Sequence, residues 1–316
     1  MTDVIDVNIN HLPENILLEI LSYLSVKDLC RTGSVCRSWR RVVRDNTLWR
    51  HVDLLPYRLN LQKMWKVIRA HFSECLLTMK VRGFVDSGGR KQKKPSLSDA
   101  MLRDLGERCP NICDLHLHMC KTDNISAGNL PGSLTRLVLH GCSWQPRWLK
   151  GNENNLKNIV DLDLSCCCRV DSFDMHDIGN WTRMKTLKLN GLYRLNEKGI
   201  KHVATSLPLL ERLELSYTQC TELAVHHISR HLKNLRHLNM SNCSLLNDSA
   251  VETLSSGLQK LEYLDLKSNS RLTISGLSSL KACKRLSVLV FDFNDDTEKQ
   301  LLQAELPNCT IVNGDV

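Results

Sequence analysis

The stretch Leu261-Glu262-Tyr263-Leu264-Asp265-Leu266-Lys267-Ser268-Asn269 is the clearest copy of a short pattern, L-x-x-L-x-L-x-x-(C/N/T/L). Its second apolar anchor recurs at Met79, Leu115, Leu137, Leu162, Leu187, Leu213, Leu238, Leu264 and Leu289. From Leu137 onward, successive anchors are 25 or 26 residues apart. A period of this length predicts a solenoid in which each unit contributes a short strand and a returning helix. We therefore expect a long concave surface, which is suited to binding rather than catalysis.

The alternation within each unit predicts which side chains face the solenoid core. In the second unit, Leu115 and Leu117 should lie on the buried face of a strand and His116 on the concave face. The ninth residue of the pattern should be small, and a polar one can hydrogen-bond the backbone of the turn. Cysteine fills this place in several units, at Cys120, Cys142, Cys167 and Cys243. Leu192 departs from the rule, so the pattern does not predict the form of the turn in its unit.

Between the strands the apolar spacing is helical. Ile200, Val203, Ala204 and Leu207 are spaced as one face of a helix, for which Asn196 is a candidate N-cap. The units resemble the cysteine-containing subclass of leucine-rich repeats. This resemblance implies an α/β solenoid, a horseshoe with parallel strands on its concave face and helices on its convex face. It covers residues 75–316 in about nine repeats, with a basic loop at 86–95 and a looser repeat at 143–158.

The chain begins with a different module. Leu12-Pro13-Glu14 opens an amphipathic helix, Ser25 can cap a second helix, and a third helix surrounds Trp39. About forty residues this rich in apolar side chains cannot bury all of them internally. The surplus apolar surface predicts a partner protein. We place this module at 8–54 and a basic helical linker at 55–74.

The ordered set Leu12-Pro13-x-x-Ile16-Leu17-x-x-Ile20-Leu21, then Val35-Cys36-x-x-Trp39 and Leu48-Trp49, resembles an F-box. Joined to cysteine-type repeats, it resembles the F-box/LRR-repeat family. The resemblance implies a non-catalytic substrate receptor of an SCF-type ubiquitin ligase, which docks on the Skp adaptor and through it on a cullin-RING scaffold. The residues that it assigns to adaptor contact or to the F-box core are Leu12, Pro13, Ile16, Leu17, Ile20, Leu21, Leu24, Leu29, Val35, Cys36, Trp39 and Trp49.

The concave face is the expected site for an unknown protein substrate. The polar and aromatic residues that we expect there are Lys188, Arg212, Glu214, Tyr217, Arg236, Asn239, Tyr263 and Asp265. Tyrosine and arginine are residue types that anchor protein interfaces. An alternative function remains open: a binding protein that sequesters its partners without cullin-dependent ubiquitination.

Composition limits the other classes of function. No catalytic motif, metal-ligand spacing or cofactor fingerprint appears. No segment approaches the roughly 18 apolar residues that span a bilayer. The net charge of +8 comes almost wholly from residues 51–95, which argues against a nucleic-acid-binding face. Without a visible secretory signal, we expect the fourteen cysteines to be reduced thiols in the cytoplasm or nucleus.

Overall fold

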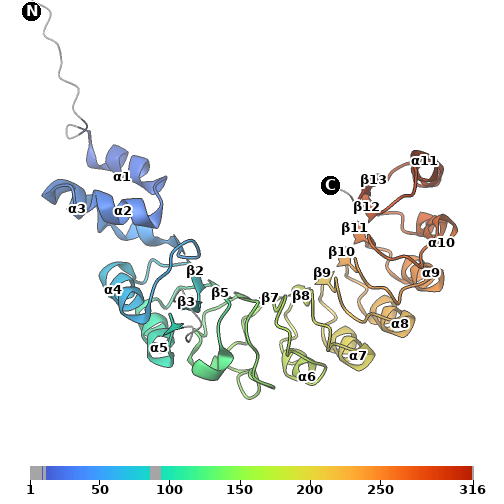
Figure 1. The fold of residues 1–316 in the computed structure, drawn as a ribbon, viewed down its shortest axis with the longest axis horizontal. Helices are drawn as coiled ribbons and strands as arrows, with labels where there is room; N and C mark the ends of the chain where they lie inside the picture. The colour runs from blue at the N-terminus through green and yellow to red at the C-terminus, as the bar shows by residue number, and fades with distance from the viewer. Residues whose placement is uncertain (1–8, 10–11, 86–93, 315–316) are drawn as a thin grey trace, which may run out of the picture.

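The computed structural model, which describes residues 9, 12–85 and 94–314, is a horseshoe with a small helical module at its N-terminal end (Figure 1). Parallel strands line the concave side and helices cover the convex side, as the repeat pattern predicts. In the described residues one sheet has eleven strands, in the order β1-β2-β5-β6-β7-β8-β9-β10-β11-β12-β13.

The strands of the large sheet are β1 (His51–Asp53), β2 (Thr78–Arg82), β5 (Asp114–His118), β6 (Arg136–His140), β7 (Asp161–Asp163), β8 (Thr186–Lys188), β9 (Arg212–Glu214), β10 (His237–Asn239), β11 (Tyr263–Asp265), β12 (Val288–Phe291) and β13 (Thr310–Asn313). The α-helices are α1 (Glu14–Ser22), α2 (Val26–Thr32), α3 (Arg37–Val43), α4 (Leu61–His71), α5 (Asp99–Arg108), α6 (Asp174–Ile178), α7 (Glu197–Ser206), α8 (Glu222–His231), α9 (Asp248–Gly257), α10 (Ile274–Leu277) and α11 (Asp296–Glu305). Short 3-10 helices are η2 (Asn46–Trp49), η3 (Thr122–Asn124), η4 (Ala127–Asn129) and η5 (Ser278–Ala282).

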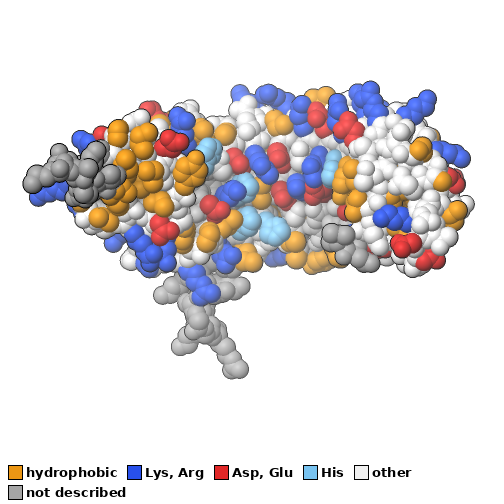
Figure 2. Space-filling view, turned by 90° about the horizontal axis from the view of Figure 1, so that it is seen from above, with side chains coloured by type: hydrophobic (Ala, Val, Ile, Leu, Met, Phe, Trp, Pro, Cys, Tyr) orange, Lys and Arg blue, Asp and Glu red, His pale blue; other side chains and the backbone are white. Residues whose placement is uncertain are grey.

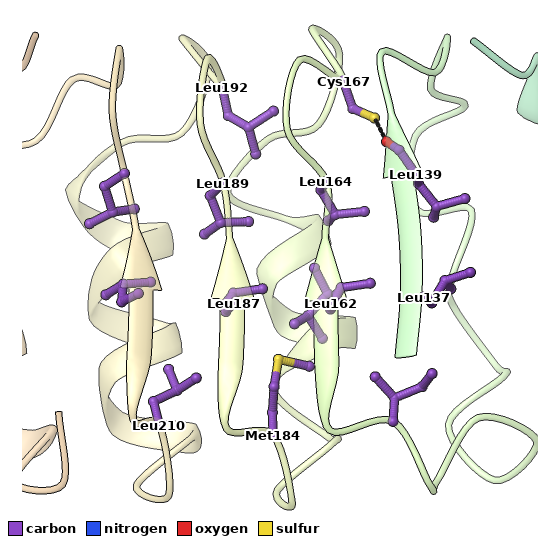
Figure 3. Packing of buried hydrophobic residues seen from close by; sticks show 14 of the residues in the cluster. Leu137, Leu139, Leu162, Leu164, Cys167, Met184, Leu187, Leu189, Leu192 and Leu210 are labelled. Carbon is purple, nitrogen blue, oxygen red and sulfur yellow. Dashed lines mark hydrogen bonds between the residues drawn. The ribbon is translucent and has the colours of Figure 1, made fainter. Parts of the chain in front are cut away.

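The second apolar anchor of every unit lies in register with that of the next. All nine predicted anchors form one continuous row of Cα partners, and all are buried. Figure 3 shows part of this core, where Leu137, Leu162 and Leu187 stack from strand to strand. Each such side chain contributes about 1.5–3 kcal/mol on burial. A single unit cannot hold itself together, so the stack as a whole supplies the stability.

The sheet extends beyond the nine expected strands at both ends. Val52 of β1 pairs with Met79, and Ile311 of β13 pairs with Leu289, so both continue the anchor row. The segment predicted as a linker, 55–74, therefore differs from expectation: its helix α4 returns from β1 to β2 as the helix of a first repeat. Met64 and Ile68 of α4 are buried in the common core.

A left-handed residue ends the strand in seven successive repeats, at Met119, Gly141, Cys166, Gly191, Tyr217, Asn242 and Ser268. The residue after it is the ninth of the pattern, and at Cys142, Cys167, Cys243 and Asn269 its side chain donates a hydrogen bond to a carbonyl of the preceding repeat. The Cys167 thiol donates to the Leu139 carbonyl at 2.7 Å (Figure 3), and the Asn269 amide donates to the Met240 carbonyl at 3.0 Å. Leu192 has no polar atom but is fully buried, and the turn keeps its form with Gly191 in the left-handed region.

The segment 143–158 is the looser repeat that the sequence predicts. Between β6 and β7 its described residues form turns instead of an α-helix. The Trp144 and Trp148 rings meet edge to face, with centroids 5.4 Å apart, and fill the space on the convex side. The Arg147 guanidinium holds the segment to α6 through Asp177, at 2.6 Å.

The described residues at either end of the predicted basic loop pair with each other. They form an antiparallel pair of two-residue strands, β3 (Phe84–Val85) and β4 (Lys94–Pro95). Residues 86–93, which include most of the basic run, lie outside the described residues. None of the helices in the described residues has both the length and the apolar character that crossing a bilayer requires.

Candidate partner-binding surfaces

Three short helices, α1 to α3, form the N-terminal module, and side-chain caps mark the starts of α2 and α3. The Ser25 hydroxyl accepts a hydrogen bond from the Asp28 N–H at 3.3 Å at the start of α2, as the sequence predicts. The Cys36 sulfur accepts one from the Trp39 N–H at 3.4 Å at the start of α3. An ion pair of 2.8 Å between Arg41 and Glu14 joins α3 to α1.

Part of the predicted F-box set is the core of this module. Leu17, Leu21, Leu29 and Trp49 are buried, and Leu24 and Trp39 pack against them half-buried. The four buried side chains hold the helices together, and Leu24 and Trp39 keep part of their surface in solvent. Leu12 and Cys36 are also half-buried, whereas Pro13 is exposed.

The other part of the set is exposed and apolar. Ile16 and Ile20 on α1 are 38% and 42% exposed, and Val35 is 66% exposed. Tyr23, which follows α1, is 83% exposed and belongs with them, although we did not include it in the predicted set. Figure 2, which looks onto the concave side, shows hydrophobic side chains gathered over this end of the molecule. We call Ile16, Ile20, Tyr23 and Val35 the F-box apolar face.

Trp49 joins the module to the repeats instead of facing a partner. Its indole stacks on the His71 imidazole of α4, with centroids 3.8 Å apart. Its Nε1–H donates to the Val43 carbonyl at 2.8 Å. Burial and the nearby Arg44 charge lower the pKa of His71, so this imidazole is neutral in the folded protein near neutral pH.

On the concave face, Glu214 is the centre of a polar network. It is buried, and its carboxylate accepts hydrogen bonds from Asn190 and Arg212, both at 2.8 Å, with Lys188 at 3.1 Å. Burial opposes ionisation of Glu214, but the hydrogen bonds from Asn190, Arg212 and Lys188 outweigh it and lower the pKa. Three residues of the predicted set, Lys188, Arg212 and Glu214, are thus brought together and largely satisfy one another.

The next two strands carry an aromatic pair. The Tyr263 ring stacks on His237, with centroids 4.1 Å apart and planes inclined by 7°. Burial, followed by the positive charge of Arg212, lowers the pKa of His237 to about 4. His237 also belongs to the concave face, because it stands directly before the anchor Leu238 in its repeat.

The remaining members of the set have local structural contacts. The side chains of Asn239 and Asp265 accept hydrogen bonds from the backbone N–H two residues on, at 2.9 and 3.1 Å, which closes the end of each strand. Arg236 precedes β10 and pairs with Glu262 at 2.6 Å, at the edge where strands begin. Tyr217 lies past the end of β9 and is 63% exposed, so it stands at the opposite edge.

Three histidines lie on the N-terminal half of the concave face. The His118 ring is 6.3 Å from His116 and 5.3 Å from His140, measured between centroids. Among the described residues, no group of three or more His, Cys, Asp or Glu side chains has a geometry that could hold a metal ion.

The chain resembles known proteins in its N-terminal module and over most of its length. The family model described as F-box-like matches residues 9–55. F-box/LRR-repeat protein 12 of Mus musculus is 31% identical over 314 residues, which are 95% of this chain and 94% of that protein. The Homo sapiens protein of the same name is 36% identical over 236 residues, or 73% of this chain and 71% of its own.

A solved structure supports the fold. A chain in the crystal structure of the yeast Rad7 and Elc1 complex matches 96% of this chain with a TM-score of 0.59, over 87% of its own length. Its sequence identity of 19% makes this a likeness of fold.

Proposed function

Because the chain belongs to the F-box/LRR-repeat family, we propose that it is the substrate-recognition subunit of an SCF-type ubiquitin ligase. In this proposal the N-terminal module binds the Skp adaptor, which connects it to a cullin-RING scaffold, and the concave face binds a target protein. The observation that carries the proposal is the F-box apolar face, which leaves large hydrophobic side chains in solvent at one end of the molecule.

The physical role of such a subunit is proximity. A target held on the horseshoe and an adaptor held at its N-terminal end belong to one assembly, which raises the effective concentration of a target lysine near the conjugating enzyme. The chain needs no catalytic group of its own for this task. The rigid connection through Trp49 and His71 supports it, because it couples the adaptor end to the repeats.

We also propose that the protein works in the cytoplasm or the nucleus. All fourteen cysteines are free thiols, and eight of them, all in the repeats, are small buried side chains. Reduced thiols are typical of these compartments. Thiol counting on protein denatured directly from cells checks this: about fourteen alkylated cysteines are expected, and a large oxidised fraction would contradict it.

The experiment that tests the ligase proposal is affinity capture of the tagged full-length chain from cells. The wild type is expected to carry the Skp adaptor and a cullin. The double variant Ile20→Asp/Val35→Asp, which places two charges on the F-box apolar face, should lose both. The matched control Leu223→Asp/Leu301→Asp changes two exposed leucines on α8 and α11, far along the array, and should retain both. Capture of the adaptor without a cullin would favour sequestration, and capture of neither would overturn the proposal.

A further inference from the structure

Five nitrogen-bearing side chains lie together on the concave face of β2, β5 and β6. Lys80 is in register with His116, Arg82 with His118, and His118 with His140. Neighbouring strands are about 4.8 Å apart and alternate residues share a face, so these five form one contiguous patch. These positions form two rows of Cα partners across β2, β5 and β6. The sixth position of the two rows is Val138, which carries no charge. We call Lys80, Arg82, His116, His118 and His140 the β2–β6 patch.

The histidines of the patch are not committed to internal hydrogen bonds. His118 Nε2 has no hydrogen-bond partner among the described residues. His116 Nε2 lies 2.8 Å from Asp114 Oδ1, but the two atoms are not aligned for a hydrogen bond. All three rings are half-buried, so a ligand has to turn a ring slightly to engage these nitrogens. Figure 2 shows histidines grouped near the middle of the concave side.

The patch differs from the rest of the concave face in how its cations are arranged. Farther along the array, the Lys188 and Arg212 charges converge on Glu214, and Arg136 lies 3.2 Å from Asp161. Those cations are largely neutralised by their own strands and neighbours. Within β2, β5 and β6, every charged or titratable side chain of the two rows is a lysine, an arginine or a histidine; the row of Lys80 is flanked by Asp53, its Cα partner on β1, and by Asp163, the partner of Val138 on β7.

We propose that the β2–β6 patch binds an acidic, extended segment of the target protein. The patch spans three strands in one direction and two alternate residues in the other, or about 10 Å by 7 Å. Charges distributed over that area suit several carboxylates along a peptide better than one compact anion. The inference rests on the proposed function, since the segment belongs to the protein presented for ubiquitination.

Binding at this patch should strengthen as pH falls, because a protonated imidazole attracts carboxylates. Burial and the neighbouring His140 and His116 lower the pKa of His118, which is therefore neutral near pH 7 and gains charge on acidification. Asp163 and Cys142 have the opposite effect and favour protonation of His118, and Arg82 of β2 is its Cα partner on the neighbouring strand. Asp114 Oδ1 faces His116, 2.8 Å from its Nε2.

Fluorescence anisotropy of the full-length chain with fluorescein-labelled hexaglutamate tests the proposal. The variant Lys80→Glu/Arg82→Glu should weaken binding at least tenfold. The matched control Lys198→Glu/Lys201→Glu makes the same charge change at two exposed positions of α7 on the convex side, and should stay within twofold of the wild type. Equal weakening by both pairs would show attraction to net charge alone and would overturn the proposal, as would a wild type that does not bind hexaglutamate.

Two further arms complete the test. Wild-type binding should be at least threefold tighter at pH 6 than at pH 8, and His116→Gln/His118→Gln/His140→Gln should abolish that difference. If a peptide with a single phosphoserine binds more tightly than hexaglutamate, the patch recognises a phosphate instead of an acidic segment. That result would overturn the proposal. Capture of the Skp adaptor on the same samples distinguishes failure of this proposal from failure of the proposed function. Variants of the β2–β6 patch should capture the adaptor normally. A wild type that captures no adaptor would contradict the proposed function.

Discussion

The indole of Trp49 stacks on the imidazole of His71, with ring centroids 3.8 Å apart and planes inclined by 16°. Trp49 ends the N-terminal module and His71 ends α4, the first helix of the repeat array. Their contact, together with the pairing of β1 with β2, places the three helices and the repeats on one continuous core. Under the proposed function, this continuous core holds an adaptor bound at one end in a fixed relation to a target bound on the concave face.

Trp49→Ala should lower the free energy of unfolding by about 3–5 kcal/mol, because it leaves a cavity at this junction and removes the hydrogen bond to Val43. Urea denaturation measures the change. Trp49→Phe keeps an aromatic ring against His71 and should cost less. A loss below about 1 kcal/mol for Trp49→Ala would mean that the junction does not stabilise the fold.

Asn269→Ala should cost about 2–4 kcal/mol, since the amide donates to Met240 and Leu266 at 3.0 and 2.8 Å and accepts from the Cys243 N–H at 2.8 Å. Removing the Asn269 amide leaves buried backbone groups of two repeats without hydrogen-bond partners. The neighbouring Ser270→Ala alters an exposed side chain and should leave the urea midpoint unchanged. Equal midpoints for both variants would show that the turn does not depend on this side chain.

Glu214→Gln should destabilise the protein by about 1–3 kcal/mol, because it removes the charge on which Arg212 and Lys188 converge in a buried position. Glu211→Gln is the comparison. Glu211 pairs with Lys185 at 2.8 Å, but the two side chains are 42% and 55% exposed, and exposed pairs contribute about 0–1 kcal/mol. Thermal unfolding should show a larger loss of stability for Glu214→Gln than for Glu211→Gln. A larger loss for Glu211→Gln would contradict the stabilising role of the Glu214 network.

Acidification should destabilise the fold through His237. Its folded pKa of about 4 is below its ordinary 6.5, so the unfolded chain takes up a proton first as pH falls. The stabilisation is complete above pH 6.5 and is lost between 6.5 and about 4. His237→Phe keeps a ring against Tyr263 without a titrating group. It should reduce the stability difference between pH 7.5 and pH 5 by about 1 kcal/mol, after allowance for solvent screening. An unchanged difference in urea titrations would refute this role.

The sequence predicts the repeats well because their signal is periodic. Nine leucine or methionine anchors recur in phase, and the structure places all of them in one row. The two end strands escape this pattern, since their anchors Val52 and Ile311 are β-branched and lie outside the 25- or 26-residue step. The segment 55–74 is part of a repeat instead of the expected linker, and the pattern does not reveal this because the anchor Val52 falls outside it.

Side-chain partnerships were harder to predict than strands. The sequence places Lys188, Arg212 and Glu214 on one face, but only the register of β8 and β9 brings the first beside the third. Within the F-box set, helical spacing does not distinguish Leu17, which is buried, from Ile20, which is 42% exposed. That distinction depends on how α1 packs on α3, a tertiary contact. Tyr23 caps the end of α1, three residues after Ile20 and seven after Ile16, a spacing that places it on their side of the helix.

The central claim is that the exposed F-box apolar face binds the Skp adaptor. Isothermal titration of purified Skp adaptor into the purified full-length chain tests it most directly. We expect saturable binding with a dissociation constant of about 1 μM or tighter for the wild type and for Leu223→Asp/Leu301→Asp. A folded Ile20→Asp/Val35→Asp variant should bind at least about a hundredfold more weakly. Wild-type strength in the Ile20→Asp/Val35→Asp variant, or no binding by the wild type, would contradict it.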